Sequence, residues 1–140
     1  MEFSKVVSTA MKISHLTQLN IYVIDGKGKI DYHDEKIVIP SFMPGAGMQD
    51  TIDFFHKIRN RSELYSYINQ WGLYYLGYSF LEQEELYFIV IGPYLEVIPN
   101  IYSLSLQYNL NSHQSSDLRD FIEKISVLTE GQISSYAAVL

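Results

Sequence analysis

The stretch Leu73–Pro93, LYYLGYSFLEQEELYFIVIGP, constrains the fold more than any other part of the chain. Two runs of aromatic and β-branched residues flank the acidic segment Glu82–Glu85, and the second run stops at Gly92-Pro93. Two such runs joined by a polar turn predict an antiparallel β-hairpin. Because large rings occur along both runs, we expect other elements to cover the hairpin, or a molecule to lie between it and them.

Length and composition favour a single globular domain over residues 1–140, long enough to bury roughly two-thirds of its unfolded surface. The chain contains 12 Tyr, 7 Phe and 1 Trp, which supply either a tyrosine-rich core or an aromatic-lined pocket. It contains no cysteine, which excludes disulfides, thiolate zinc sites and cysteine nucleophiles and suits a reducing cytoplasm.

The charge pattern argues against binding to nucleic acid or membrane. The formal net charge is −6, and the one basic cluster, Lys57, Arg59 and Arg61, has Asp53 and Glu63 beside it. A protein that neutralises phosphates needs a basic face. The N-terminus lacks the basic start and unbroken apolar run of a signal peptide, and the apolar runs are too short to span a bilayer.

Periodicity predicts helices and strands along the whole chain. The expected helices cover residues 2–16, 51–59, 63–71, a segment from 101, a segment from 115 or 116, and one from a capping box at Thr129–Gln132 to the terminus. The expected strands cover residues 19–24 and 29–33, joined by the Asp25-Gly26 turn, a short run at 36–39, and the hairpin. In the helix predicted over 63–71, the inward residues are Leu64, Tyr65, Ile68 and Trp71.

This order predicts an α+β fold: a five-stranded antiparallel sheet with helices on one face and a helical C-terminal tail. PAS and GAF domains share this plan of an N-terminal hairpin, short helices over the sheet and a second hairpin. In those domains the small molecule, where there is one, lies between the helices and the sheet.

No residue pattern argues for an enzyme, a metal or a cofactor. His15, His33, His56 and His113 are scattered, and the serines lie in neither GxSxG nor SxxK. The carboxylates of Glu82–Glu85 belong to an exposed hairpin tip. We interpret the segment Tyr32–Glu35 as the solvent-exposed end of a strand and not as a catalytic group, because adjacent strand residues point to opposite faces of the sheet.

The sequence from Leu86 to Tyr94, LYFIVIGPY, resembles the second sheet hairpin in the N-terminal sensor regions of AraC-type transcriptional regulators of Gram-positive bacteria. The similar group is found in streptococci and staphylococci and includes the regulators named for YSIRK-type surface antigens. The opening helix, the strand into Asp25-Gly26 and the later helical stretches match in order and spacing. The resemblance implies a cytoplasmic sensory and dimerisation domain, with the two helix-turn-helix units of the family absent from this chain. Its end in a helical pattern at Val139-Leu140 is that expected for the N-terminal part of a longer regulator.

Two sets of residues follow as candidates, together with three functional hypotheses. The expected ligand-binding residues are Phe55, Tyr65, Ile68, Trp71, Tyr75, Gly77 and Phe88. The expected homodimer interface includes Phe3, Val7, Ile133, Tyr136 or Val139, because their helices carry apolar stripes longer than one sheet face can cover. The alternatives to a ligand sensor are a small-molecule-binding protein or enzyme that uses the same pocket, and a dimerisation module without ligand.

Overall fold

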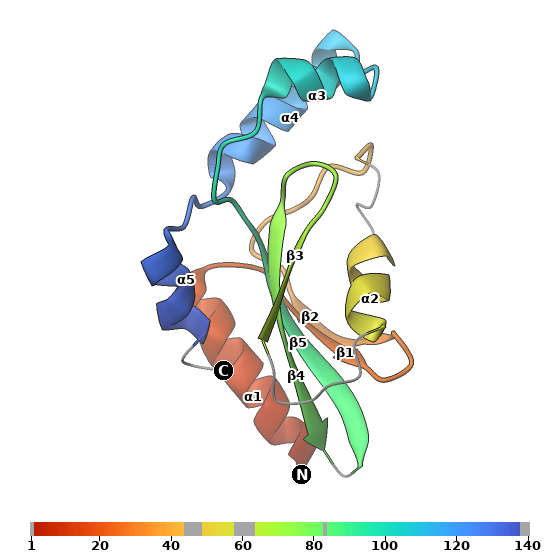
Figure 1. Cartoon of the computed structure of the whole chain (residues 1–140), viewed down its shortest axis with the longest axis vertical. Coiled ribbons are helices and arrows are strands. Elements are labelled where there is room, and N and C mark those ends of the chain that lie inside the picture. The colour runs from red at the N-terminus through yellow and green to blue at the C-terminus, as the bar shows by residue number, and fades with distance from the viewer. Residues whose placement is uncertain (1, 44–48, 58–63, 83, 138–140) are drawn as a thin grey trace.

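The computed structural model describes residues 2–43, 49–57, 64–82 and 84–137. The fold is α+β, as expected, and contains five helices and five strands within this part of the chain (Figure 1). In chain order the elements are α1 (Glu2–Thr17), β1 (Ile21–Asp25), β2 (Ile30–Asp34), α2 (Gln49–His56), β3 (Leu64–Ile68), β4 (Tyr74–Glu82), β5 (Glu85–Tyr94), α3 (Ile101–Gln107), α4 (Ser112–Lys124) and α5 (Glu130–Ala137).

The five strands form one antiparallel sheet in the order β2-β1-β5-β4-β3. Both predicted hairpins are present. In the first, the Asp25 side chain accepts hydrogen bonds from the backbone N–H groups of Lys27 and Lys29, both at 2.9 Å, and Gly28 has a φ of +85° that suits glycine. The second hairpin pairs β4 with β5 as the sequence predicts.

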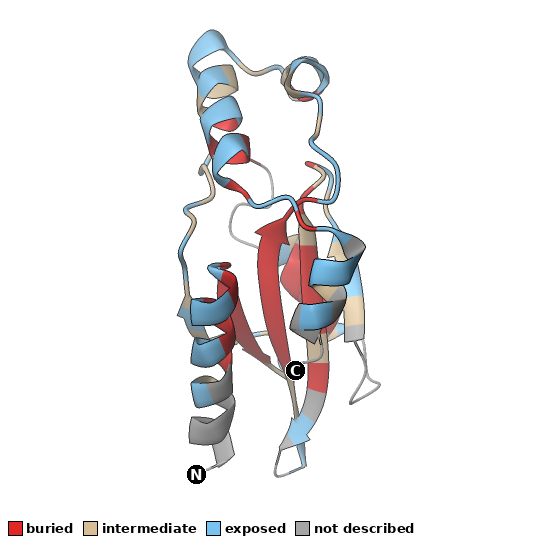
Figure 2. Ribbon diagram, turned by 90° about the vertical axis from the view of Figure 1, so that its left-hand side faces the viewer, coloured by how far each residue is buried: buried red, intermediate tan, exposed pale blue. Residues whose placement is uncertain are grey.

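Helices cover both faces of the sheet, so the expectation of helices on one face is wrong. On one face, Ala10 and Ile13 of α1 pack with Ile21 and Val23 of β1. On the other face lies α2 (Figure 1). The reason is visible in β1, where residues 21–24 are all buried (Figure 2). A strand that is apolar on both sides needs a cover on each.

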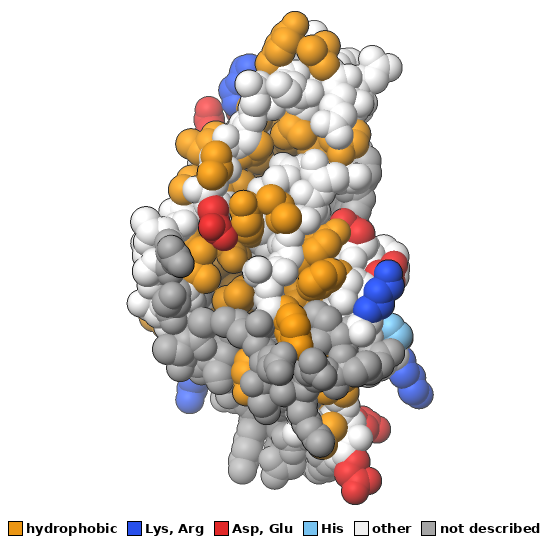
Figure 3. Space-filling model, in the orientation of Figure 1, with side chains coloured by type: hydrophobic (Ala, Val, Ile, Leu, Met, Phe, Trp, Pro, Cys, Tyr) orange, Lys and Arg blue, Asp and Glu red, His pale blue; other side chains and the backbone are white. Residues whose placement is uncertain are grey.

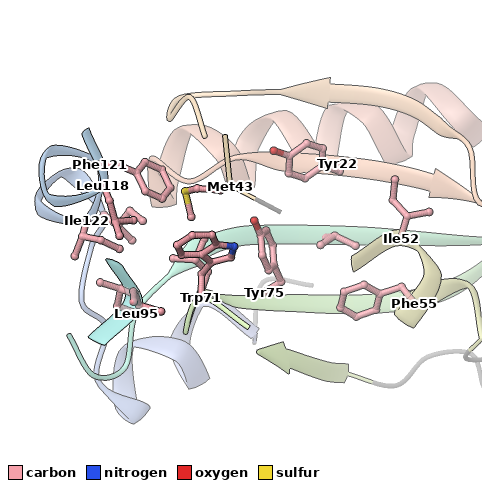
Figure 4. Close-up of a cluster of buried hydrophobic side chains, with 14 of the residues drawn as sticks. Tyr22, Met43, Ile52, Phe55, Trp71, Tyr75, Leu95, Leu118, Phe121 and Ile122 are labelled. Atoms are coloured by element: carbon pink, nitrogen blue, oxygen red, sulfur yellow. The ribbon is translucent and has the colours of Figure 1, made fainter. Parts of the chain in front are cut away.

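The helices α3 and α4 extend the domain beyond one end of the sheet, whereas α5 lies beside α1 (Figure 1). Leu118, Phe121 and Ile122 of α4 lie beside Met43 and Leu95 in the larger buried cluster (Figure 4). The helix α4 begins before the predicted Ser115, because the side chains of Asn111 and Gln114 form a reciprocal capping box. The predicted box at Thr129–Gln132 is confirmed, with both hydrogen bonds present.

Two local predictions are wrong. Residues 64–68 form strand β3 rather than a helix, with Tyr67 opposite Tyr75 on β4. Residues 36–39 are not a strand, because the N–H groups of Lys36 and Ile37 bond to the buried Asn20 side chain instead of a neighbouring strand. Among the described residues, we find no helix both long and apolar enough to cross a membrane.

Candidate functional site

The sheet face beneath α2 carries most of the large buried rings. Phe55 and Phe88 lie with ring centroids 6.3 Å apart, and both are fully buried. The Phe55 ring rests directly on the backbone of Gly77, where a Cβ atom would overlap it. The sheet is therefore filled at this point, and glycine is required there by contact with a side chain of the chain itself.

A group of polar side chains lies on the same face; we call it the tyrosine–aspartate cluster, and it consists of Tyr22, Asp50, Tyr67 and Tyr75. The tyrosines come from β1, β3 and β4, and Asp50 comes from the first turn of α2. In Figure 4 the rings of Tyr22 and Tyr75 are drawn between Met43 and Trp71 on one side and Ile52 and Phe55 on the other.

Asn20 fixes one side of this cluster. Its fully buried amide donates to the Tyr22 hydroxyl at 3.2 Å and to the Ile37 carbonyl at 2.7 Å. Its side-chain oxygen accepts from the N–H groups of Lys36 and Ile37. The Tyr22 hydroxyl in turn donates to Glu35 at 3.2 Å. All the polar groups of Asn20 and Tyr22 are therefore satisfied within the protein.

Asp50 is not satisfied in this way. One carboxylate oxygen of Asp50 accepts from the Tyr67 hydroxyl at 3.1 Å. The other, Oδ1, is buried and has no hydrogen-bond partner within the part of the chain that the structure describes. The Tyr75 side chain beside it is 1% exposed. One unpaired buried oxygen thus occurs in this cluster among the described residues, and such an atom costs stability.

The electrostatics of the cluster favour neutral tyrosines. Burial raises the pKa of Tyr75 well above its usual value, and the nearby Tyr22, Asp50 and Glu35 raise it further. Burial, followed by the charge of Glu35, likewise raises the pKa of Tyr22. Burial and Asp50 raise the pKa of Tyr67. The hydroxyls therefore remain hydrogen-bond donors at neutral pH.

Six of the seven residues predicted to bind a ligand lie on this face. Phe55, Trp71, Tyr75 and Phe88 belong to one buried cluster, Tyr65 packs against it, and Gly77 contacts Phe55. Ile68 does not belong with them: it is 51% exposed, because β3 alternates and places it on the opposite face from Tyr67. A ligand role for the six stays a prediction.

The predicted interface residues are only partly described. Val7 is half-buried on α1, and Ile133 of α5 packs against the cluster beneath α1. The side chains of Phe3 and Tyr136, and the whole of Val139, lie outside the described residues. The homodimer stays a prediction.

Sequence reasoning missed the polar half of the site. Tyr22 could have been found from the alternation in β1, which places it on the same face as Asn20. Tyr67 was hidden by the helical interpretation of 63–71. Asp50 was recognised only as a helix start, since an unpaired oxygen depends on contacts between distant segments.

A separate cleft of about 750 Å³ lies between the segment 36–40 and α4. Its lining carries Lys36 and Lys124 as well as Asp117 and Asp120, so the two signs of charge are balanced. It contains none of the predicted ligand-binding residues. Within the described ranges, no three His, Asp or Glu side chains gather to hold a metal ion.

Comparison with known proteins gives no match: no family model, no curated protein and no solved structure is significantly similar to this chain.

Proposed function

We propose that this chain is the ligand-sensing and dimerisation domain of a bacterial transcriptional regulator of the AraC type and acts in the cytoplasm. One observation supports the sensing role above the others. The face between α2 and the sheet combines buried aromatic rings with a buried carboxylate oxygen of Asp50 that has no hydrogen-bond partner among the described residues. Small-molecule sites are typically apolar and aromatic, with a few polar groups that orient the ligand.

The contacts of Trp71 supply a route from this site to the C-terminal helices. Trp71 is buried in the turn between β3 and β4, where the Asn69 side chain accepts from its backbone N–H at 2.9 Å. Its ring stacks on Tyr108, at the end of α3, with centroids 4.1 Å apart. A ligand that binds one arrangement of Trp71 more tightly than another would shift α3 and α4.

The surface of α3 supports a further contact in the regulator. Tyr102 and Leu106 lie on one side of α3 and are 70% and 66% exposed. Hydrophobic side chains are visible over this helix in Figure 3. In the proposal, this surface contacts another domain of the full regulator.

A dimerisation module without ligand is the rival, and the Phe55–Gly77 contact favours it, because that part of the interior is filled. Native mass spectrometry of the chain purified under mild conditions separates the two. A sensor retains or takes up a small molecule from a metabolite extract, and the Trp71 fluorescence changes on binding. A crystal structure with a dry, filled interior and no bound mass in any extract would overturn the sensing role.

The dimerisation part needs its own test. Analytical ultracentrifugation of the chain at tens of micromolar is expected to give a dimer. The substitution Val7→Lys, on the N-terminal helix, is expected to shift it to a monomer without changing the circular dichroism spectrum. A wild-type monomer at these concentrations would overturn this part alone.

A further inference from the structure

The strand β3 forms one edge of the sheet, and solvent reaches its outer side. It is the last strand in the order β2-β1-β5-β4-β3, so none of the other described strands pairs with that side. Ser66 is exposed, and Ile68 is 51% exposed. An open edge of this kind is a template on which a further strand can pair.

The pairing with β4 shows which backbone groups of β3 face outward. At the turn that joins the two strands, the Asn69 N–H donates to the Leu73 carbonyl at 2.9 Å. Hydrogen-bonded positions alternate along an antiparallel pair, so positions 67 and 65 direct their N–H and C=O groups toward β4. Positions 66 and 68 direct theirs away from it. The two exposed residues are therefore those whose backbone groups point outward.

The two edges of the sheet differ in how they are protected. At the other edge, β2 carries Asp31 and Asp34, and its register with β1 is interrupted between Val23 and Ile24. Charges and irregularities of this kind prevent a further strand from pairing with an edge. The strand β3 has a regular register with β4, and residues 64–81 contain no Asp, Glu, Lys or Arg. In a chain of net charge −6, this edge is where two copies can meet with less like-charge repulsion than at β2.

The sequence of β3 is complementary to itself. LYSYI presents the same residue classes in both directions: apolar, Tyr, Ser, Tyr, apolar. In an antiparallel pair of two copies centred on Ser66, Tyr65 lies opposite the partner's Tyr67, and the apolar positions 64 and 68 lie opposite each other. Aromatic and apolar cross-strand pairs stabilise a sheet. The two copies of Ser66 exchange both backbone hydrogen bonds at the two-fold axis, as an isologous contact requires.

We propose that two copies of the chain join through β3 in this register and continue the sheet across the two-fold axis. The occupant of the edge is a second copy, because the pattern of β3 is matched by β3 itself. A strand of five residues buries little area, so the contact is weak and forms at several hundred micromolar. This contact is separate from the α1 interface of the proposed function and does not depend on it.

The Val7→Lys chain isolates the β3 contact, because this substitution is expected to remove the association through α1. In sedimentation velocity, Val7→Lys is expected to be a monomer at tens of micromolar and a dimer at several hundred micromolar. Addition of Ser66→Lys places two like charges opposite each other at the axis, and it is expected to weaken the association at least about 10-fold. The control Ser116→Lys makes the same change on the exposed side of α4 and should leave it unchanged.

Two further measurements test the register. A mixture of the Ser66→Lys and Ser66→Glu variants is expected to restore the association, because opposite charges then meet at the axis. Hydrogen exchange followed by NMR needs no substitution in β3. The N–H groups of Ser66 and Ile68 should exchange more slowly in proportion to the dimer fraction, whereas those of Tyr65 and Tyr67, bonded to β4, should be protected at every concentration.

The outcomes are separable from those of the proposed function. A Val7→Lys chain that stays monomeric up to millimolar concentration overturns the β3 contact and leaves the edge to an extended segment of another protein. Association that Ser66→Lys does not weaken, or that leaves exchange at Ser66 and Ile68 unchanged, lies on another surface and overturns it as well. A wild-type monomer at tens of micromolar contradicts the α1 interface alone. The melting temperatures of the two lysine variants show that they are folded.

Discussion

At the scale of single residues, Gly77 shows how one missing side chain positions a whole helix. The Phe55 ring occupies the space of its Cβ, and Phe55 belongs to α2. We expect Gly77→Ala to lower the free energy of unfolding by about 1–3 kcal/mol through overpacking, measured by urea denaturation. The control Gly131→Ala, on exposed helix α5 where a Cβ meets nothing closer than 3.9 Å, is expected to stabilise slightly.

A double substitution tests the cause. If the clash with Phe55 is responsible, Gly77→Ala combined with Phe55→Leu costs less than the sum of the two single changes. Additive costs would show that the glycine is needed for a different reason.

Asn20 is a second residue with a disproportionate role. Its side chain makes four hydrogen bonds, and these replace strand pairing for the segment at Lys36 and Ile37. We expect Asn20→Ala to cost about 2–4 kcal/mol in unfolding free energy, because it leaves several buried groups unpaired. The same change at the exposed Gln107 is the control. If Asn20→Ala lowers the free energy of unfolding no more than the control does, water replaces the hydrogen bonds of the amide without loss of stability.

At the scale of elements, the contribution of the N-terminal cap of α4 to stability can be measured separately from that of its buried face. Asn111 and Gln114 bond reciprocally at 2.8 and 3.1 Å in an exposed position. We expect Asn111→Ala to lower the unfolding free energy by about 1 kcal/mol. In the same helix, the exposed Ser116→Ala should be neutral or slightly stabilising, because alanine is the better helix former. Thermal denaturation followed by circular dichroism measures both, and equal effects would contradict the capping role.

Elements with a long sequence pattern could be predicted, and the short strand β3 could not. The long helix α1 and the β4–β5 hairpin were predicted because many residues repeat one period. The short β3 was misread, because Leu64, Tyr65, Ile68 and Trp71 fit helical spacing as well as a five-residue strand does. The strand wins through its pairing with β4, which the local sequence does not reveal.

The same limit applied to the site. Tyr75 and Gly77 could be placed on one face of their strand from alternation alone. Asp50 could not, because its unpaired oxygen results from the meeting of α2 with β3 and β4.

At the scale of the whole molecule, the buried tyrosines predict alkaline unfolding. The pKa values of Tyr22 and Tyr75 are raised by burial, and burial followed by Glu96 raises that of Tyr94 to about 12. The unfolded chain therefore loses these protons first, at about pH 10, while the folded chain keeps them. The stabilisation is complete below about pH 10 and is lost as the pH rises toward the folded-state values.

The expected loss is up to about 1.4 kcal/mol per pH unit for each such tyrosine, measured by urea midpoints with tyrosinate absorbance as the second readout. The Tyr75→Phe variant should show a shallower decline. The same slope in this variant and in wild type would contradict the assignment.

The strand order also determines when the sheet can form during synthesis. The central strand is β5, which lies between β1 and β4, so residues 21–25 find their inner partner only in residues 87–91. Pairings this distant in sequence are slow to close. Until the ribosome has released β5, the first hairpin has one paired edge and the apolar side chains of β1 lack their neighbours. The apolar side chains of β1 therefore stay without this partner until residues 87–91 have been synthesised, well past the middle of the chain.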